Sequence, residues 1–337
     1  MNSRPTLVTG ATGLLGNNVV RMLLDRGEPV RVFVRGTSDP RPLEGLEVQI
    51  VRGDVCDPES VRRACEGVDC VIHSAGYVQI GRGHLDWHRR VNVGGTRHVA
   101  EAARAVGARL IHVSSCDAVG INSLEEPADE ETPWNDPPPV PYVITKREAE
   151  QVVLEEIDRG LDAVIVNPGF MLGPWDWKPS SGRMLLEVGS GKGIIAPYGW
   201  FSLCDARDVA RGVLAAVQLG RTGRRYILAG VTFSYLEAWR MFAEVAGSRY
   251  PWCRVGTLTL LIAGFGADLS TRFTGHEPEV NSGAIALAAL PKNYTSKRAE
   301  TELGYRIRPS RETVRDAWAW FQRYRYTQRS PLRRKGA

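Results

Sequence analysis

Short apolar runs alternate with longer segments of helical periodicity through the first half of the chain. The runs are rich in β-branched residues and occupy residues 6–9, 30–34, 48–51, 70–73, 109–115 and 163–167. Nearly continuous apolar strands are typical of a parallel sheet that helices cover on both faces. The intervening segments have helical periodicity, several of them stop at a glycine, and they span residues 14–27, 58–67, 84–107 and 142–160. This order predicts an α/β fold with a doubly wound parallel sheet.

The pattern changes after Pro168. Loops rich in Gly, Pro and Trp follow, with helical segments near residues 206–218, 233–246 and 310–323. We expect this half to form a smaller C-terminal α/β lobe over the carboxyl edge of the sheet. The apolar run 257–266 is about half as long as a bilayer-spanning helix, so we expect a buried or lobe-packing helix there.

A glycine-rich turn follows the first expected strand and opens the first expected helix. In "TGATGLLG", Gly10, Gly13 and Gly16 recur at three-residue spacing. Glycines at such a junction let backbone N–H groups and a helix N-terminus approach a pyrophosphate. The turn therefore predicts a Rossmann-type dinucleotide site. The residues that we expect to contact the cofactor here are Gly10, Thr12, Gly13, Leu14, Leu15 and Gly16.

Arg35 stands at the end of the second strand, nineteen residues beyond Gly16. NAD enzymes of this fold carry an acid at that place, which binds the ribose 2′-hydroxyl. A guanidinium instead offers paired donors to a 2′-phosphate. Arg35 therefore predicts NADP rather than NAD as the cofactor, with a solvated surface arginine as the alternative.

Two further strand ends carry candidate cofactor residues. "GDV" follows the third strand and places Asp54 near the adenine amino group, with Val55 beside it. "HSAG" ends the fourth strand, and we expect its small residues Ala75 and Gly76 to lie along the cofactor. We interpret His73 as a packed strand-end residue rather than as a catalyst.

The stretch "YVITK" places Tyr142 and Lys146 four residues apart, and so on one face of an expected helix. A free tyrosine titrates near 10, but an adjacent ammonium and a cationic nicotinamide both favour the phenolate. Tyr142 can then exchange a proton with an alcohol oxygen as hydride moves at the neighbouring carbon. Ser115, at the end of "IHVSS", would hydrogen-bond the same oxygen. The pattern predicts catalytic residues Ser115, Tyr142 and Lys146.

These motifs resemble those of an extended short-chain dehydrogenase/reductase of the NAD-dependent epimerase/dehydratase superfamily. The resemblance covers residues 5–323 and rests on "TGATGLLG", "GDV", "HSAG", "VNVGGT", "VSSCDAVG", "YVITK", "NPGFMLGP", "DARDVARG" and "TSKRAETELGY". The chain is most similar to dihydroflavonol-4-reductase-like and hopanoid-associated epimerase-like members.

The resemblance implies roles beyond those that the residues themselves suggest. Lys146 would also hold the nicotinamide ribose, and Pro168 and Gly169 would lie along the nicotinamide. Asn92 matches a helix asparagine of structural or proton-relay use, of which we expect the structural one. Cys116 follows the catalytic serine, and we expect its thiol to be inert.

The resemblance and the motifs together define the expected domains. Residues 1–168 would form the NADP-binding Rossmann domain with the catalytic residues. Residues 169–323 would form mainly the substrate-binding lobe, with some elements returning to the first domain. Residues 324–337 carry five basic and no acidic side chains and are expected to be a disordered tail.

The expected activity is interconversion of a secondary alcohol and a ketone with NADP, on a dihydroflavonol-like or 3β-hydroxysteroid-like substrate. An aromatic segment from Trp175 to Phe201 suits a flat or apolar ligand, although such residues are also ordinary core material. Lys178, Arg183 and Lys192 could instead hold a second pyrophosphate, which keeps a nucleotide-sugar epimerase or dehydratase open. A protein that senses NADP without turnover is the third alternative.

The composition argues mainly against certain kinds of site and partner. The six cysteines include no Cys-x-x-Cys pair, so the sequence signals no metal site, and reduced thiols suit a cytoplasmic protein. Polar residues directly follow Met1, which argues against a secretory signal. The net charge of +5 is modest. We expect a small-molecule substrate, no nucleic-acid partner and no membrane span, and the oligomeric state stays open, a homodimer included.

Overall fold

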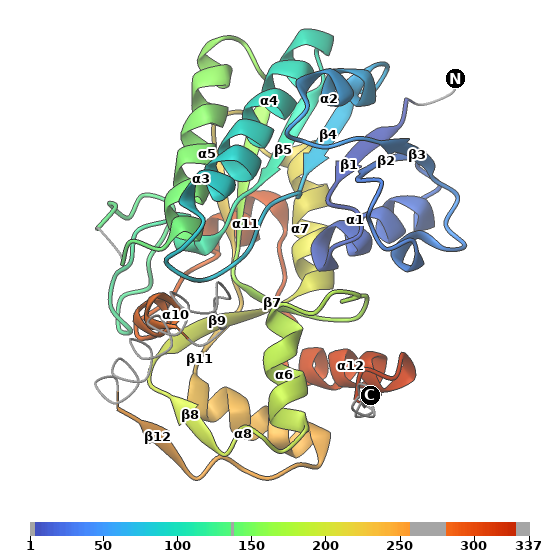
Figure 1. Cartoon of the computed structure of the whole chain (residues 1–337). Coiled ribbons are helices and arrows are strands. Elements are labelled where there is room, and N and C mark those ends of the chain that lie inside the picture. The colour runs from blue at the N-terminus through green and yellow to red at the C-terminus, as the bar shows by residue number, and fades with distance from the viewer. Residues whose placement is uncertain (1–3, 136–137, 257–280, 328–337) are drawn as a thin grey trace, which may run out of the picture.

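Seven parallel strands form the central sheet of this computed structural model, which describes residues 4–135, 138–256 and 281–327 (Figure 1). Their order across the sheet is β10-β6-β5-β4-β1-β2-β3. The strands are β1 (Thr6–Thr9), β2 (Val30–Val34), β3 (Gln49–Arg52), β4 (Cys70–His73), β5 (Arg109–Val113), β6 (Ala163–Pro168) and β10 (Arg225–Leu228). The order reverses direction at β1 and β4, as it does in a doubly wound Rossmann sheet. The predicted fold class is confirmed, whereas β10 was not predicted as a strand.

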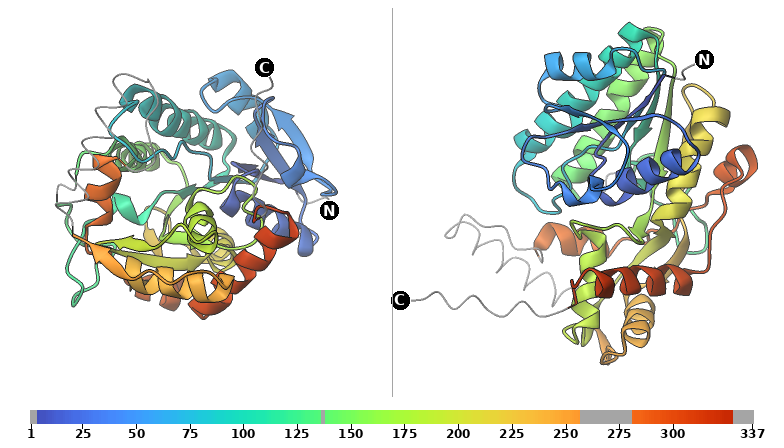
Figure 2. Two further views of the ribbon diagram at one scale, coloured as in Figure 1. Left: turned by 60° about the horizontal axis from the view of Figure 1, so that its bottom comes forward. Right: turned by 90° about the vertical axis from the view of Figure 1, so that its right-hand side faces the viewer.

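Helices cover both faces of the sheet. One face carries α1 (Leu14–Asp25) and α7 (Ala206–Leu219), and the other carries α2 (Pro58–Cys65), α4 (Gly95–Val106) and α5 (Pro141–Asp158) (Figures 1 and 2). Because both faces are covered, successive strand residues are buried on opposite sides. Val8 packs in the layer beneath α1 and α7, whereas its neighbour Leu7 packs in the opposite layer. This two-sided burial explains why inner strands such as β1 and β4 are nearly continuous apolar runs, whereas the edge strand β3 is largely exposed.

The helix expected over residues 84–107 is divided into three parts. His84 has a left-handed φ of 62°, a short α3 (Leu85–His88) follows, and residues Arg89–Gly94 form a π-helical segment before α4. Asn92 lies in this segment and is buried. Wide π turns of this kind are frequent at functional sites.

The C-terminal lobe lies beyond the carboxyl ends of the central strands (Figure 1). Its three-stranded sheet has the order β11-β9-β7, and a ribbon pairs β12 with β8. The lobe elements are β7 (Phe170–Leu172), α6 (Ser181–Gly189), β8 (Ile195–Pro197), β9 (Trp200–Asp205), β11 (Val231–Ser234), α8 (Tyr235–Ala246), β12 (Cys253–Val255), α10 (Ser282–Ala288) and α12 (Ser310–Arg323). In contrast, α7, β10 and α11 (Lys297–Leu303) pack with the central sheet and its helices.

The ordered chain continues past residue 323. Tyr326 lies in the region expected to be a disordered tail, yet its hydroxyl donates a hydrogen bond of 2.7 Å to the Trp177 carbonyl. The rest of the basic tail from residue 328 and the apolar run 257–266 lie outside the described residues. Among the described helices, none combines the length and the apolarity that crossing a bilayer requires.

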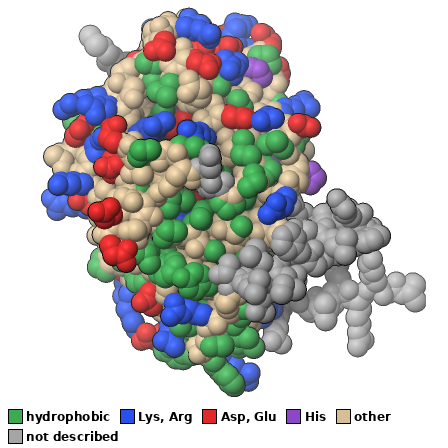
Figure 3. Space-filling model, turned by 90° about the vertical axis from the view of Figure 1, so that its left-hand side faces the viewer, with side chains coloured by type: hydrophobic (Ala, Val, Ile, Leu, Met, Phe, Trp, Pro, Cys, Tyr) green, Lys and Arg blue, Asp and Glu red, His purple; other side chains and the backbone are tan. Residues whose placement is uncertain are grey.

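Acidic and basic side chains are intermixed over much of the face shown in Figure 3. Many of them pair locally, as Arg89 does with Glu148 at 2.7 Å. Hydrophobic side chains gather lower on the same face, toward the lobe. The exposed apolar side chains of the lobe include Ile194, Ile195 and Trp252.

Candidate active site

The catalytic residues predicted from the sequence lie together at the carboxyl end of β5. Ser115 follows this strand and caps a short 3-10 turn, while Tyr142 and Lys146 lie one turn apart at the start of α5. All three side chains are buried. Burial raises the Tyr142 pKa, and an interaction with the Ser115 side chain acts to lower it, so the two groups are neighbours. The arrangement brings a proton donor, a hydroxyl and an ammonium to one point.

Lys146 is anchored by the strand beneath it. Its Nζ donates a hydrogen bond of 2.9 Å to the Val113 carbonyl. Burial lowers the Lys146 pKa from 10.5 to about 8, and the charge of Glu150 opposes that shift. The ammonium is therefore present at neutral pH but is close to losing its proton under mildly alkaline conditions.

Glu150 lies one turn beyond Lys146 on α5 and is completely buried. Its carboxylate accepts a hydrogen bond of 2.7 Å from Arg225 and one of 2.6 Å from the Asn167 side chain. The same Asn167 amide also donates to the Ser115 carbonyl at 2.9 Å. Glu150 thus holds the Ser115 backbone through Asn167 and supplies a negative charge near Lys146.

We expect Glu150→Gln to move the alkaline limit of cofactor binding to lower pH by on the order of one unit. The substitution removes the charge that raises the Lys146 pKa, so the ammonium is lost sooner as pH rises. Cofactor dissociation constants measured between pH 6 and 10 check this. Glu156→Gln is the matched control, because Glu156 also lies on α5, is buried and is paired with arginines. An unchanged limit in Glu150→Gln contradicts the assigned role.

Tyr142 retains its proton in the free protein. Burial raises the Tyr142 pKa above its ordinary value, the charge of Asp117 adds to that rise, and the hydrogen bond from Ser115 opposes it. The expected net shift toward the phenolate is therefore wrong for the free protein, because the loss of solvation outweighs the favourable contacts. In this state Tyr142 is a proton donor.

The glycine-rich turn has the close packing that a dinucleotide cradle requires. Gly10 has a left-handed φ of 70°, and a Cβ there would come within 2.7 Å of the Ala75 backbone nitrogen. A Cβ on Gly16 would approach the Gly10 carbonyl oxygen to 2.3 Å. Gly13 occupies the N-cap of α1, and no side chain caps this end of the helix. The N–H groups of the first turn are therefore available to a pyrophosphate.

The other predicted cofactor residues lie at the carboxyl ends of β2, β3, β4 and β6. The structure places Arg35 after β2, Asp54 and Val55 after β3, Ala75 and Gly76 after β4, and Pro168 and Gly169 at the end of β6. Arg35 is exposed to solvent. Gly76 adjoins the catalytic lysine, because a Cβ on it would lie 3.5 Å from the Lys146 Nζ. The predicted cofactor residues thus extend from the glycine-rich turn along the strand ends to Lys146.

A model of the NAD dependent epimerase/dehydratase family matches residues 6–229. The chain belongs to this family. Sterol demethylase protein B of Methylococcus capsulatus is 38% identical over 94% of this chain and 98% of that protein. A Synechocystis protein named "Putative dihydroflavonol 4-reductase" is 31% identical over 95% of each chain. The crystal structure of gox2253 matches with a TM-score of 0.83 at 34% identity, covering 96% of this chain and 99% of that one.

These relatives and the Rossmann sheet identify an NAD(P)-dependent enzyme of the extended short-chain dehydrogenase/reductase type. The resemblance seen in the sequence is confirmed, including its dihydroflavonol-reductase-like relatives.

Two polar residues near the candidate catalytic residues, His73 and Asn92, have structural contacts. His73 is buried between Thr9 at 2.7 Å and Thr96 at 3.2 Å, and burial lowers its pKa to about 3, so it is a neutral packed residue as expected. The Asn92 side chain bonds the Tyr77 backbone and the Thr145 hydroxyl. Both residues therefore have a structural role, because their hydrogen bonds connect segments around the site.

The Cys116 thiol is also buried, and its Sγ donates to the Asn167 carbonyl at 3.1 Å. Burial raises the Cys116 pKa well above its ordinary value. The thiol therefore stays protonated, which is the state of an unreactive cysteine.

Two of the tryptophans expected to line the substrate site pack against α12. Trp175 and Trp177 contact Trp320 of α12, with ring centroids 6.4 and 5.2 Å apart. The Arg21 guanidinium of α1 lies 3.4 Å from the centre of the Trp175 ring. Phe201 is buried against Phe170 and Tyr235. Trp175 and Trp177 are thus partly buried against α12, and the aromatic wall of the substrate site stays a prediction.

Sequence reasoning missed an ion pair beside the catalytic serine. The Lys292 Nζ lies 2.6 Å from the Asp117 carboxylate, and both side chains are mostly buried. The Asp117 backbone N–H donates to the Ser115 Oγ at 3.1 Å. The position of Asp117 two residues after Ser115 was an available signal. No local pattern indicates Lys292, which follows α10.

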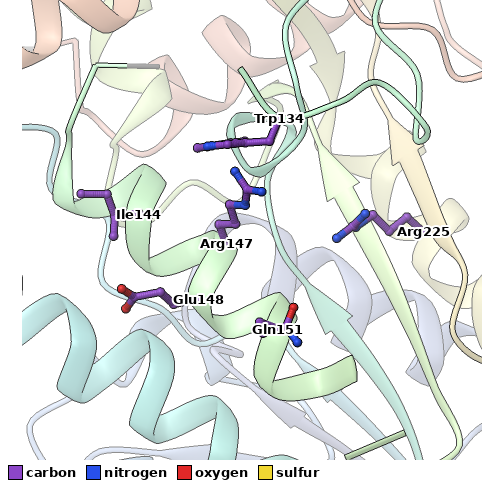
Figure 4. Close-up of a pocket in the computed structure, with 6 residues that line it drawn as sticks. All are labelled: Trp134, Ile144, Arg147, Glu148, Gln151 and Arg225. Carbon is purple, nitrogen blue, oxygen red and sulfur yellow. The ribbon is translucent and has the colours of Figure 1, made fainter. Parts of the chain in front are cut away.

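A hollow of about 400 Å³ lies beside α5 (Figure 4). It is lined by Trp134, Ile144, Arg147, Glu148, Gln151 and Arg225. The Arg147 guanidinium stacks 3.8 Å from the centre of the Trp134 ring. Because Ser115, Tyr142 and Lys146 are not among the residues that line it, we do not assign this hollow to the catalytic centre.

Proposed function

We propose that this enzyme interconverts a secondary alcohol and a ketone, with NADP as its cofactor. The observation that carries the proposal is the burial of Ser115, Tyr142 and Lys146 together at the end of the dinucleotide cradle. A buried phenol beside a serine hydroxyl is suited to exchange a proton with a substrate oxygen. NADP is proposed because Arg35 is exposed at the position where a 2′-phosphate would be bound.

The proposed reaction in the reducing direction uses each residue differently. NADPH, when bound, supplies hydride to the carbonyl carbon. Tyr142 donates its proton to the carbonyl oxygen, and Ser115 donates a hydrogen bond to that oxygen while negative charge develops on it. Lys146 holds the nicotinamide ribose and provides a positive charge beside the phenol. A proton taken up from solvent restores Tyr142, so the products are the alcohol and the oxidised cofactor.

We propose an apolar ring ketone or alcohol as the substrate class. Two relatives named for sterol demethylation and dihydroflavonol reduction support an apolar ring system. The basic side chains of the lobe give less support to a nucleotide-sugar substrate, which would bring a second diphosphate. Lys192 is paired with Glu187 at 2.8 Å, and Lys178 is exposed. A nucleotide sugar would require fixed cations facing the site.

The test is a substrate screen with the full chain. NADPH oxidation and NADP reduction are followed with aromatic ketones, sterols and nucleotide sugars, and we expect turnover with members of the first two groups. Tight binding of a UDP- or GDP-sugar by the cofactor-loaded protein, with no ketone turned over, would support the epimerase alternative. Cofactor binding without turnover of any compound would support the sensor alternative.

A further inference from the structure

The Asp117–Lys292 ion pair has no part in the proposed hydride and proton transfers, yet it borders the catalytic residues. Asp117 Oδ2 lies 3.5 Å from the Ser115 Oγ, and Oδ1 lies 2.6 Å from the Lys292 Nζ. The charge of Asp117 also raises the pKa of Tyr142 and of Tyr235 in the lobe, after the larger effect of burial. Asp117 thus contacts Ser115 and Lys292 directly, and its charge also acts on the phenols of Tyr142 and of Tyr235, which begins α8.

Both parts of the molecule fix the position of Lys292. Pro291 forms a β-bridge with Trp200 of β9, and Tyr294 forms one with Ala128. Between them, the Asn293 side chain donates to the Leu124 carbonyl and accepts from Thr232. The backbone of Lys292 is thus held between the lobe and the segment that follows β5. The ammonium is therefore preorganised beside Asp117.

The pair retains hydrogen-bonding capacity. The Lys292 side chain is 14% exposed and the Asp117 side chain is 19% exposed, so neither is fully enclosed. An ammonium has three donors and a carboxylate has about four acceptor sites, whereas the described residues show one close contact between the two. Partly buried charges are stabilised when further hydrogen bonds satisfy them. A substrate oxygen next to Ser115 would supply such bonds.

We propose that Asp117 and Lys292 determine specificity by binding a second oxygen of the substrate, a hydroxyl on the carbon next to the reacting carbonyl. This inference rests on the proposed function. An oxygen bound by Ser115 places the oxygen of the neighbouring carbon within reach of Asp117, because the two side chains are only 3.5 Å apart. A hydroxyl donates to the carboxylate and accepts from the ammonium, so it satisfies both. A carboxylate would be repelled by Asp117, and a methoxy group has no proton to donate.

The experiment compares three ketones that share one ring system: 1-indanone, 2-hydroxy-1-indanone and 2-methoxy-1-indanone. We expect kcat/KM with NADPH to be about 10- to 100-fold higher for the hydroxy ketone than for 1-indanone, the range for a hydrogen bond to a charged group. Asp117→Asn and Lys292→Met should each reduce this ratio toward one. The ratio does not depend on the fraction of folded enzyme, so partial misfolding of a variant does not obscure the result.

Arg311→Met is the matched control, because it breaks the exposed Arg311–Glu244 pair on the lobe surface. This variant should keep the ratio of the unmodified enzyme. Equal kcat/KM for 1-indanone and the hydroxy ketone would overturn the inference while the proposed function stands. A preference that survives in both Asp117→Asn and Lys292→Met would overturn it as well. If none of the three ketones is reduced, the proposed function fails, and the inference fails with it.

Discussion

Replacing Tyr142 by Phe should lower turnover of the alcohol or ketone substrate by at least ~100-fold while cofactor binding is retained. The substitution removes the proton donor and keeps the ring. Tyr142 is 8% exposed and lies against the cofactor side of the fold, next to Ser115. Tyr142 is the one tyrosine of α5, and it is the phenol on which Ser115 acts. Single-turnover rates, together with cofactor affinity measured by fluorescence, separate the two effects.

Tyr226→Phe is the control for loss of a buried tyrosine hydroxyl. Tyr226 lies on β10, where its hydroxyl donates to Glu302 at 2.8 Å and its side chain packs in the layer beneath α1 and α7. This variant should keep normal turnover. Lys146→Ala should impair both turnover and cofactor binding, since the ammonium is proposed to act on both. Near-normal turnover in Tyr142→Phe would show that another group transfers the proton.

The parts of the fold that the sequence predicted are those that depend on local pattern. A sheet buried on both faces requires apolar residues at successive positions, so β1, β2 and β4 stand out from their surroundings. Lys146 follows Tyr142 by one helical turn, which sequence spacing alone indicates. The glycine-rich turn is likewise a contiguous motif.

The features that the sequence did not predict depend on packing between distant segments. The contacts of Glu150 with Arg225 and of Asp117 with Lys292 join residues that no local pattern connects. The same is true of Trp175, whose aromatic character is visible in the sequence while its partner Trp320 belongs to α12. Residue type therefore indicated the chemistry, but tertiary structure determined which side chains face the substrate.

The second largest expected effect concerns Arg35, a basic residue at the place where NAD enzymes of this fold carry an acid. We expect Arg35→Asp to weaken NADPH binding by about 10- to 100-fold and to favour NADH relative to NADPH. Hydrogen bonds to a charged group contribute roughly 1.5 to 3 kcal/mol, which corresponds to about one to two powers of ten in affinity. The aspartate would also repel the 2′-phosphate and could accept hydrogen bonds from the 2′-hydroxyl of NADH. Titration of both cofactors against the unmodified and substituted proteins gives the two ratios.

The exposure of Arg35 makes a control for general electrostatics necessary. Arg62→Asp makes the same change in net charge on α2, where Arg62 pairs with Glu59 at 2.7 Å on the surface. Long-range attraction between exposed charges is largely screened at physiological ionic strength, so Arg62→Asp should leave the NADPH to NADH ratio almost unchanged. If both substitutions weaken NADPH equally, or if the unmodified protein binds both cofactors equally well, Arg35 does not select the cofactor. A loss confined to Arg35→Asp and to NADPH would assign the 2′-phosphate to this guanidinium, because only a local contact distinguishes two cofactors that differ at that one group.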